Sequence, residues 1–158
     1  SKDGKVFESL VEKLNAPPEY ANESAIIFQP DGEAICLLRQ DVVGKYASGY
    51  VGQAKAPYTD WTWKKLDKAI GGPNLMRLPD GRLLAAVRLY QPQRTSLAWL
   101  DPETGKLTEC LRLSVGGDVS YPGMVLHEKK LFVSYYSGPS VTDTKVYLAT
   151  VSIPGLNE

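Results

Sequence analysis

Four side chains in this sequence have the chemistry of a catalytic or anion-binding site: Glu23, Arg39, Arg88 and Tyr121. A carboxylate can accept a proton, and a phenol beside it can lose one. The two guanidiniums stay charged at any working pH, and their forked donors suit a carboxylate ligand. These residues are spread over most of the chain, so the elements that carry them decide whether they meet.

The residues around Glu23 and Arg39 predict a β-hairpin. The stretch NESAIIFQPDGEAICLLR, residues 22–39, contains two apolar runs joined by a Pro-Asp-Gly turn. In an antiparallel hairpin the start of one strand lies beside the end of its partner, so Glu23 and Arg39 are expected to be neighbours. Opposed charges on paired strands are also a common structural ion pair, and this pair alone does not establish a function.

The hairpin pattern recurs along the chain, in residues 26–40, 74–90 and 123–137. The turn residues Asp31, Asp80 and Glu128 are separated by 49 and then 48 residues. Further short apolar runs follow each hairpin, which gives about four strands per repeat. A period near 48 with four strands is typical of one blade of a β-propeller.

The expected fold is therefore an all-β propeller segment. Residues 21–158 are predicted to form three four-stranded blades, at about 21–70, 71–117 and 118–158. Residues 1–20 are predicted to form a short helix, over residues 5–15, and a linker. Three blades cannot close a ring, so they are expected to be half of a six-bladed one. Missing N-terminal blades or a second copy, in a homodimer, would supply the rest; an open β-sandwich is the alternative.

The repeat predicts where the four candidate residues lie. Arg39 and Arg88 each follow their turn by eight residues, and Tyr136 holds the same place in the third repeat. Glu23 and Tyr121 stand near the starts of their repeats. All are expected at one end of the propeller, facing a central funnel. Tyr121 and Arg88 each also have a purely structural alternative. Tyr121 would be an aromatic residue of a turn, and Arg88 would pack against Asp118 or Tyr90.

The ordered set of residues resembles the sialidase (neuraminidase) family. NESAIIFQPDGEAICLLR is similar to the family pattern in which an Asn-Glu pair opens a strand and an Arg closes the hairpin. GGPNLMRLPDGRLLAAVR resembles the blade that carries the next Arg, and DVSYPGMV the segment that carries a Tyr. The resemblance covers most of residues 20–152, in the family's last three blades. The chain is also similar to uncharacterised sialidase-like propellers with NES and SYPG signatures.

This resemblance implies a site for an acidic sugar. Tyr121 would be the nucleophile, Glu23 its base, and Arg39 with Arg88 would bind the substrate carboxylate. A neutral phenol suits such a substrate, because a carboxylate nucleophile would approach like charge with like charge. The family's acid Asp and first Arg belong to earlier blades. The alternative function, from a different class, is a non-catalytic propeller that binds a glycan or a protein.

The amino-acid composition limits which other classes of partner and cofactor are expected. The 18 Lys and Arg balance 18 Asp and Glu, so neither a nucleic acid nor a membrane surface is expected to bind. No metal or other cofactor is expected, since His127 is the lone histidine. Cys36 and Cys110 lie in apolar runs and are predicted to be buried free thiols, with a disulfide left open.

Overall fold

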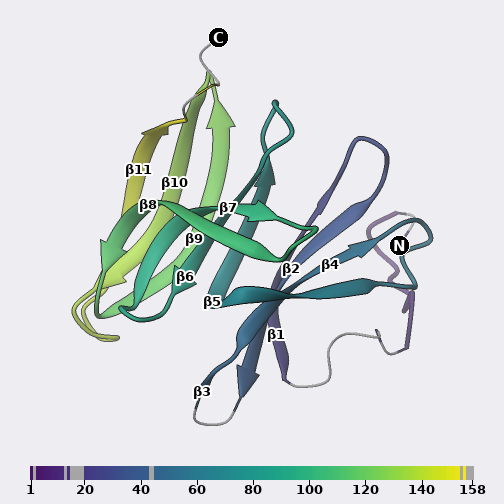
Figure 1. Cartoon of the computed structure of the whole chain (residues 1–158), viewed down its shortest axis with the longest axis horizontal. Coiled ribbons are helices and arrows are strands. Elements are labelled where there is room, and N and C mark those ends of the chain that lie inside the picture. The colour runs from purple at the N-terminus through teal and green to yellow at the C-terminus, as the bar shows by residue number, and fades with distance from the viewer. Residues whose placement is uncertain (2, 13, 15–19, 43–44, 154, 156–158) are drawn as a thin grey trace.

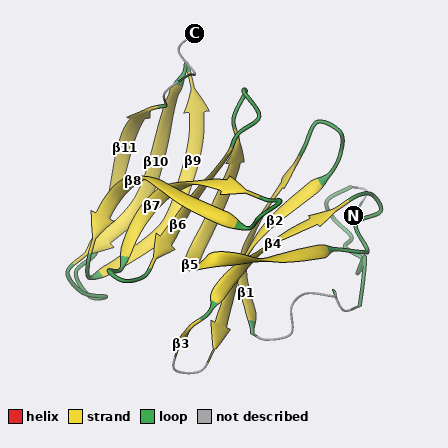
Figure 2. Cartoon of the chain, in the orientation of Figure 1, coloured by secondary structure: helices red, strands yellow, loops and turns green. Residues whose placement is uncertain are grey.

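The computed structural model describes residues 1, 3–12, 14, 20–42, 45–153 and 155 of the chain. Strands joined by turns make up the fold, and no helix occurs among these residues (Figure 2). In chain order the strands are β1 (Ala21–Phe28), β2 (Ala34–Val42), β3 (Lys45–Tyr46), β4 (Ser48–Ala54), β5 (Thr62–Arg77), β6 (Leu83–Leu89), β7 (Arg94–Asp101), β8 (Lys106–Val115), β9 (Asp118–His127), β10 (Lys130–Gly138) and β11 (Lys145–Ser152). The expectation of an all-β fold is confirmed.

The helix predicted for residues 5–15 was wrong for the part of that segment that the structure describes, which forms bends and irregular chain. Val6 and Phe7 are 64% and 79% exposed, so these two apolar side chains bury no surface that would stabilise so short a helix. Asp3 Oδ1 instead accepts hydrogen bonds from the backbone amides of Lys5, at 2.9 Å, and Val6, at 3.2 Å. Residues 13 and 15, and the predicted linker before Tyr20, lie outside the described residues.

The strands form three antiparallel units (Figure 1). Unit I consists of β1, β2, β4 and the first half of β5, with β3 paired to β2. Unit II consists of the second half of β5 with β6, β7 and β8. Unit III consists of β9, β10 and β11, one strand fewer, among the described residues, than the four that the sequence predicted. The continuous β5 thus links the first two units.

The turns explain why the hairpins recur. Asp31 Oδ1 accepts a hydrogen bond from the Glu33 amide at 3.1 Å, and Asp80 Oδ1 accepts one from the Arg82 amide at 3.0 Å. The glycine after each aspartate has a positive φ, +91° at Gly81, which a side chain disfavours. Equivalent turn chemistry therefore closes the hairpins of units I and II.

The core consists of apolar layers between the units. Along β6, Leu83, Ala85 and Val87 face unit I, where they pack with Ile35 and Leu37. The alternate residues of β6, Leu84 and Ala86, face unit III and pack with Leu131 and Val133. A strand buried on both faces explains the continuous apolar run LLAAV, and it fixes unit II between its two neighbours.

Both cysteines are free, but only one is buried. Cys36 lies in a third apolar cluster, on the face of unit I that points away from unit II, and burial raises the pKa of its thiol to about 11. Cys110 is exposed, so the prediction of a buried thiol was wrong there. The reason is that β8 is the last strand of its sheet and has one open edge.

Candidate functional site

The three units place equivalent residues at one end of the molecule. The strand pairing is irregular around Glu23 in β1, around Gly72 in β5 and around Tyr121 in β9. Successive members of this set are 49 residues apart. Such irregularities re-aim side chains away from the regular alternation of a strand. Here they bring the three positions into direct contact across the units.

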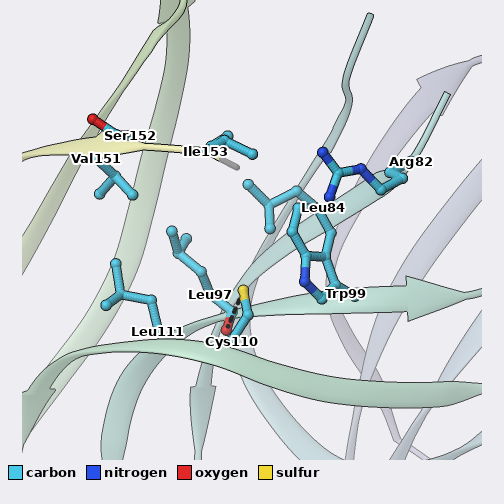
Figure 3. Close-up of a pocket in the computed structure, with 9 residues that line it drawn as sticks. All are labelled: Arg82, Leu84, Leu97, Trp99, Cys110, Leu111, Val151, Ser152 and Ile153. Carbon is cyan, nitrogen blue, oxygen red and sulfur yellow. Dashed lines mark hydrogen bonds between the residues drawn. The ribbon is translucent and has the colours of Figure 1, made fainter. Parts of the chain in front are cut away.

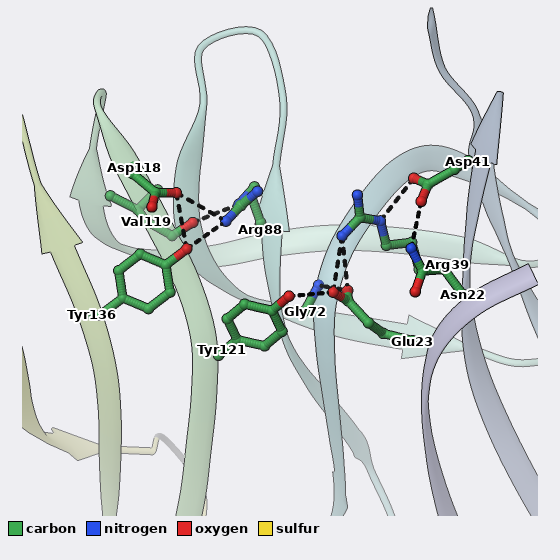
Figure 4. A network of polar contacts seen from close by, with 10 residues as sticks. All are labelled: Asn22, Glu23, Arg39, Asp41, Gly72, Arg88, Asp118, Val119, Tyr121 and Tyr136. Carbon is green, nitrogen blue, oxygen red and sulfur yellow. Dashed lines mark hydrogen bonds and ion pairs between the residues drawn. The ribbon is translucent and has the colours of Figure 1, made fainter. Parts of the chain in front are cut away.

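Glu23 is the centre of the network that results (Figure 4). Arg39 Nη1 donates to both of its carboxylate oxygens, at 3.0 Å each, which confirms the predicted neighbours. The backbone amide of Gly72 donates to Oε2 at 2.8 Å, and the Tyr121 hydroxyl donates to Oε1. Glu23 from unit I is therefore bound by groups from all three units.

The charges of this network favour an ionised Glu23 beside a neutral phenol. Burial raises the pKa of Glu23, but hydrogen bonds from Tyr121, Arg39 and the Gly72 amide outweigh it, and the pKa is lowered. The same hydrogen bond to Glu23, with burial, raises the pKa of Tyr121. Near neutral pH the arrangement is therefore an ionised carboxylate that accepts a hydrogen bond directly from a neutral phenol.

The backbone at Tyr121 is held in an uncommon conformation. Its φ of +47° lies in the left-handed region that residues other than glycine seldom adopt. Gly72 packs closely against it, since a Cβ added at Gly72 would lie 2.2 Å from Ser120 Oγ and 3.0 Å from the Tyr121 nitrogen. The Tyr121 side chain remains 58% exposed. The packing against unit II thus holds a strained residue whose ring still faces solvent.

Arg88 lies in a neighbouring cluster rather than on Glu23. Its Nη2 contacts Asp118 Oδ1 at 3.3 Å and the Tyr136 hydroxyl at 2.8 Å, and its Nε donates to the Val119 carbonyl at 2.6 Å. The Tyr136 hydroxyl donates to Asp118 at 2.9 Å. The rings of Tyr121 and Tyr136 stack with centroids 6.0 Å apart. The structure thus brings three of the four predicted residues into one network and places Arg88 beside it.

Sequence reasoning missed Asp41. Its Oδ1 accepts a hydrogen bond from Arg39 Nε at 2.9 Å, and its Oδ2 accepts one from Asn22 Nδ2 at 2.5 Å. Asp41 therefore holds Arg39 in place from the side opposite Glu23 (Figure 4). The available signal was its position two residues after Arg39, which puts both side chains on the same face of a strand.

A separate cavity of about 380 Å³ lies between units II and III (Figure 3). Leu84 and Leu97 are among its apolar walls, and the guanidinium of Arg82 lies 4.4 Å from the centre of the Trp99 ring. Cys110 lies at its edge, where partial burial raises the pKa of the thiol. Its described lining residues include no carboxylate or imidazole to activate that thiol, so the composition indicates packing rather than chemistry.

The part of the chain that the structure describes contains neither a metal-binding cluster nor a membrane-spanning helix. No group of three or more His, Cys, Asp or Glu side chains is placed to hold a metal ion there. Within the same residues, no helix is long and apolar enough to cross a membrane.

Solved structures with the same fold include glycoside hydrolases and one protein of unknown function. That protein, from Dyadobacter fermentans, matches with a TM-score of 0.70 and 22% identity over 84% of this chain and 38% of its own. The α-L-arabinanase of Penicillium chrysogenum, complexed with arabinobiose, has a TM-score of 0.66 and 12% identity. The match covers 84% of this chain and 46% of the arabinanase. The GH93 α-L-arabinofuranosidase of Fusarium graminearum, also with arabinobiose, has a TM-score of 0.68 and 14% identity. The match covers 88% of this chain and 48% of the arabinofuranosidase.

These likenesses establish a β-propeller fold. The two enzymes are β-propeller glycoside hydrolases, an arabinanase and an arabinofuranosidase rather than sialidases. At such identities a likeness shows the fold and not the activity. The chain spans less than half of the length of each of the three proteins. No protein-family profile and no curated protein sequence matches the chain.

Proposed function

We propose that the complete protein is a β-propeller glycoside hydrolase of the sialidase type, which acts on an acidic sugar. The observation that carries this proposal is the hydrogen bond from the Tyr121 hydroxyl to Glu23, with Arg39 bound to the same carboxylate. A phenol paired with an ionised carboxylate is a nucleophile with its base in place. The arabinobiose complexes of two propellers with this fold support a sugar as the ligand class.

The proposed reaction gives Tyr121 and Glu23 distinct roles and also needs a proton donor for the leaving group. Tyr121 Oη forms a bond to the anomeric carbon while the bond from that carbon to the leaving oxygen breaks. The phenol proton passes to Glu23, and the leaving oxygen takes a proton from an acid. Water then forms a bond to the anomeric carbon as the bond from Tyr121 Oη breaks; the phenol recovers its proton from Glu23, and the proton lost by the water restores the acid. Asp41 and Asp118 already bind arginines, so this acid would come from another part of the complete propeller.

The two arginines would bind the sugar carboxylate. Arg39 Nη2 and Arg88 Nη1 make no hydrogen bond or ion pair within the described residues, so each guanidinium keeps a donor for a ligand. Asp41 and Glu23 hold Arg39, while Asp118 and Val119 hold Arg88. Guanidiniums fixed in this way lose little freedom when they bind an anion.

A non-catalytic glycan-binding propeller is the second candidate. The ion pairs of Asp41 and Asp118 with arginines favour it, because neither aspartate is then available to protonate a leaving group. In either case this chain would supply three blades, at about 21–70, 71–117 and 118–158. Further blades, or a second copy of the chain in a homodimer, would complete a six-bladed ring. The length of the propellers with this fold supports that completion, since each is more than twice the part matched here.

Turnover of a fluorogenic sialoside tests the first candidate. The assay uses the 158-residue chain after light scattering has shown whether it closes a ring by dimerisation. We expect Tyr121→Phe to lower kcat by about 100-fold or more, because the nucleophile is lost. Tyr147→Phe is the matched control, since this half-exposed residue lies in β11, on the outer edge of unit III.

Binding separates the two candidates. We expect Arg39→Lys to weaken the binding of N-acetylneuraminic acid about tenfold, because the forked donor is lost while the charge stays. Arg112→Lys, at a half-exposed side chain of β8, should leave this binding unchanged. Binding without turnover would favour the non-catalytic module. A closed ring that neither binds this sugar nor hydrolyses its glycosides would contradict both.

A further inference from the structure

A second cleft opens between units I and II, with a volume of about 400 Å³. Its lining includes Tyr46, Ser48, Asp67, Lys68, Tyr90 and Gln91. These residues come from β3, β4, β5 and the turn that follows β6, so both units contribute to it. The volume falls within the range of small-ligand sites, about 300–1,000 Å³.

The cleft adjoins the candidate site through Tyr90. A Cβ added at Gly71 would lie 2.6 Å from the Tyr90 hydroxyl, and Gly71 directly precedes the residue whose amide binds Glu23. Burial lowers the pKa of Arg39, but the hydrogen bond to Glu23 and the neighbouring Tyr90 outweigh it, so that this pKa is raised. One wall of the cleft thus reaches the site.

That wall is aromatic. The rings of Tyr46 and Tyr90 stack with centroids 3.8 Å apart and planes 17° from parallel. Tyr46 is nevertheless 62% exposed, so the stack presents a ring to the solvent. A large aromatic surface with a hydroxyl at its tip provides both the apolar contact and the hydrogen bond that a sugar ring can use.

The charges that line the cleft are already paired. Lys68 Nζ donates to Asp67 Oδ2 and to the Leu107 carbonyl, at 2.6 Å each, and Asp67 Oδ1 accepts from the Leu107 amide at 2.9 Å. Arg94, which also lines the cleft, binds both carboxylate oxygens of Glu109. An ionic ligand would find no uncompensated charge among these groups, whereas a neutral ligand rich in hydroxyls could use their remaining hydrogen-bonding capacity.

We propose that this cleft is a subsite for a neutral sugar, the residue to which the acidic sugar is linked. The proposal rests on the proposed function for the identity of the neighbouring ligand, but the cleft's own preference for a neutral, hydroxyl-rich ring follows from its lining. The complete ligand would then be an oligosaccharide whose acidic end lies at Arg39 and whose neutral part lies along Tyr90 and Tyr46.

Calorimetry with three probes tests the subsite: N-acetylneuraminic acid, lactose and 3′-sialyllactose. We expect the trisaccharide to bind the 158-residue chain about tenfold more tightly than N-acetylneuraminic acid. Tyr46→Ala should weaken trisaccharide and lactose binding about three- to tenfold and leave N-acetylneuraminic acid unaffected. Because Tyr46 is mostly exposed, its truncation leaves the core intact. Tyr147→Ala, on β11, is the matched control.

The outcomes distinguish this subsite from the acidic-sugar site. Lactose binding that depends on Tyr46, without any binding of N-acetylneuraminic acid, would support the subsite and contradict the proposed function. Equal affinities for the acid and the trisaccharide, both insensitive to Tyr46→Ala, would overturn the subsite and leave the acidic-sugar site standing. Binding of none of the three probes would overturn both.

Discussion

The hydroxyl of Tyr121 donates a hydrogen bond to Oε1 of Glu23, although the two residues are 98 positions apart in the sequence. Glu23 stands in the first strand of unit I and Tyr121 in the first strand of unit III. Between them lies Gly72, the equivalent position of unit II, whose amide binds the same carboxylate. The contact therefore exists only because three repeats stack with their irregular positions aligned.

Replacing Glu23 should change the titration of Tyr121. The hydrogen bond to Glu23 is the main cause of the raised Tyr121 pKa, so Glu23→Gln should move that pKa down toward 10. A ¹³Cζ tyrosine NMR titration measures the shift, with Tyr121→Phe used to assign the signal. If the protein hydrolyses the sialoside, the same variant should lower kcat by about 100-fold or more. A Tyr121 pKa that stays unchanged would contradict the pairing.

At acid pH, the enzymatic rate should depend on the ionisation of Glu23. Its pKa lies below the ordinary 4.5, so the base is ionised at neutral pH and becomes protonated only as the pH falls below 4.5. Activity should therefore persist at about pH 5 and decline at lower pH. A profile whose acid limb has its midpoint above about pH 5 would argue against Glu23 as the base.

Gly72→Ala should destabilise the protein and disturb the site. The substitution combines a φ of +50° with a Cβ only 2.2 Å from Ser120 Oγ. We expect a loss of about 2–4 kcal/mol in the free energy of unfolding, measured by urea denaturation. Gly116→Ala is the matched control, because φ is +76° there and no heavy atom lies within 4 Å of an added Cβ. It should cost about 1 kcal/mol; equal losses would contradict the close packing at Gly72.

Glu109 should make part of the stability depend on pH. Arg94 donates to its two oxygens at 2.8 and 2.7 Å, and this pairing lowers the pKa of Glu109 to about 2. A carboxylate with a lowered folded pKa stabilises the fold above its ordinary value of 4.5, and this contribution is lost as the pH falls from 4.5 through about 2. Glu109→Gln should cost about 1–2 kcal/mol at neutral pH.

Urea denaturation at about pH 7, 4 and 3 measures this dependence. The difference in unfolding free energy between the native protein and Glu109→Gln should shrink progressively below pH 4.5. Glu128→Gln, at a side chain that is 83% exposed, should show a negligible difference at each pH. A Glu109→Gln cost that stays constant over this range would exclude the Arg94 pairing as its source.

Much of the strand pattern could be predicted from local sequence. The Asp-Gly turns and alternating apolar residues specify hairpins within about 20 residues, so the residue pattern alone places Glu23 beside Arg39. The helix predicted over residues 5–15 does not form in the described part of that segment, for a related reason. Its apolar spacing is helical, but a short helix needs a surface to pack on, and Val6 and Phe7 have none.

Local sequence was sufficient to specify the all-β character, the period of about 48 residues and the set of candidate side chains, because turn chemistry and strand alternation act between neighbours in the chain. Which of those side chains meet depended on the packing of the three units. That packing joins Tyr121 to Glu23, and it turns Arg88 toward Asp118 and Tyr136. The physical reason is that these contacts depend on how the units stack and where each strand departs from regular pairing, and neither is encoded within a single hairpin.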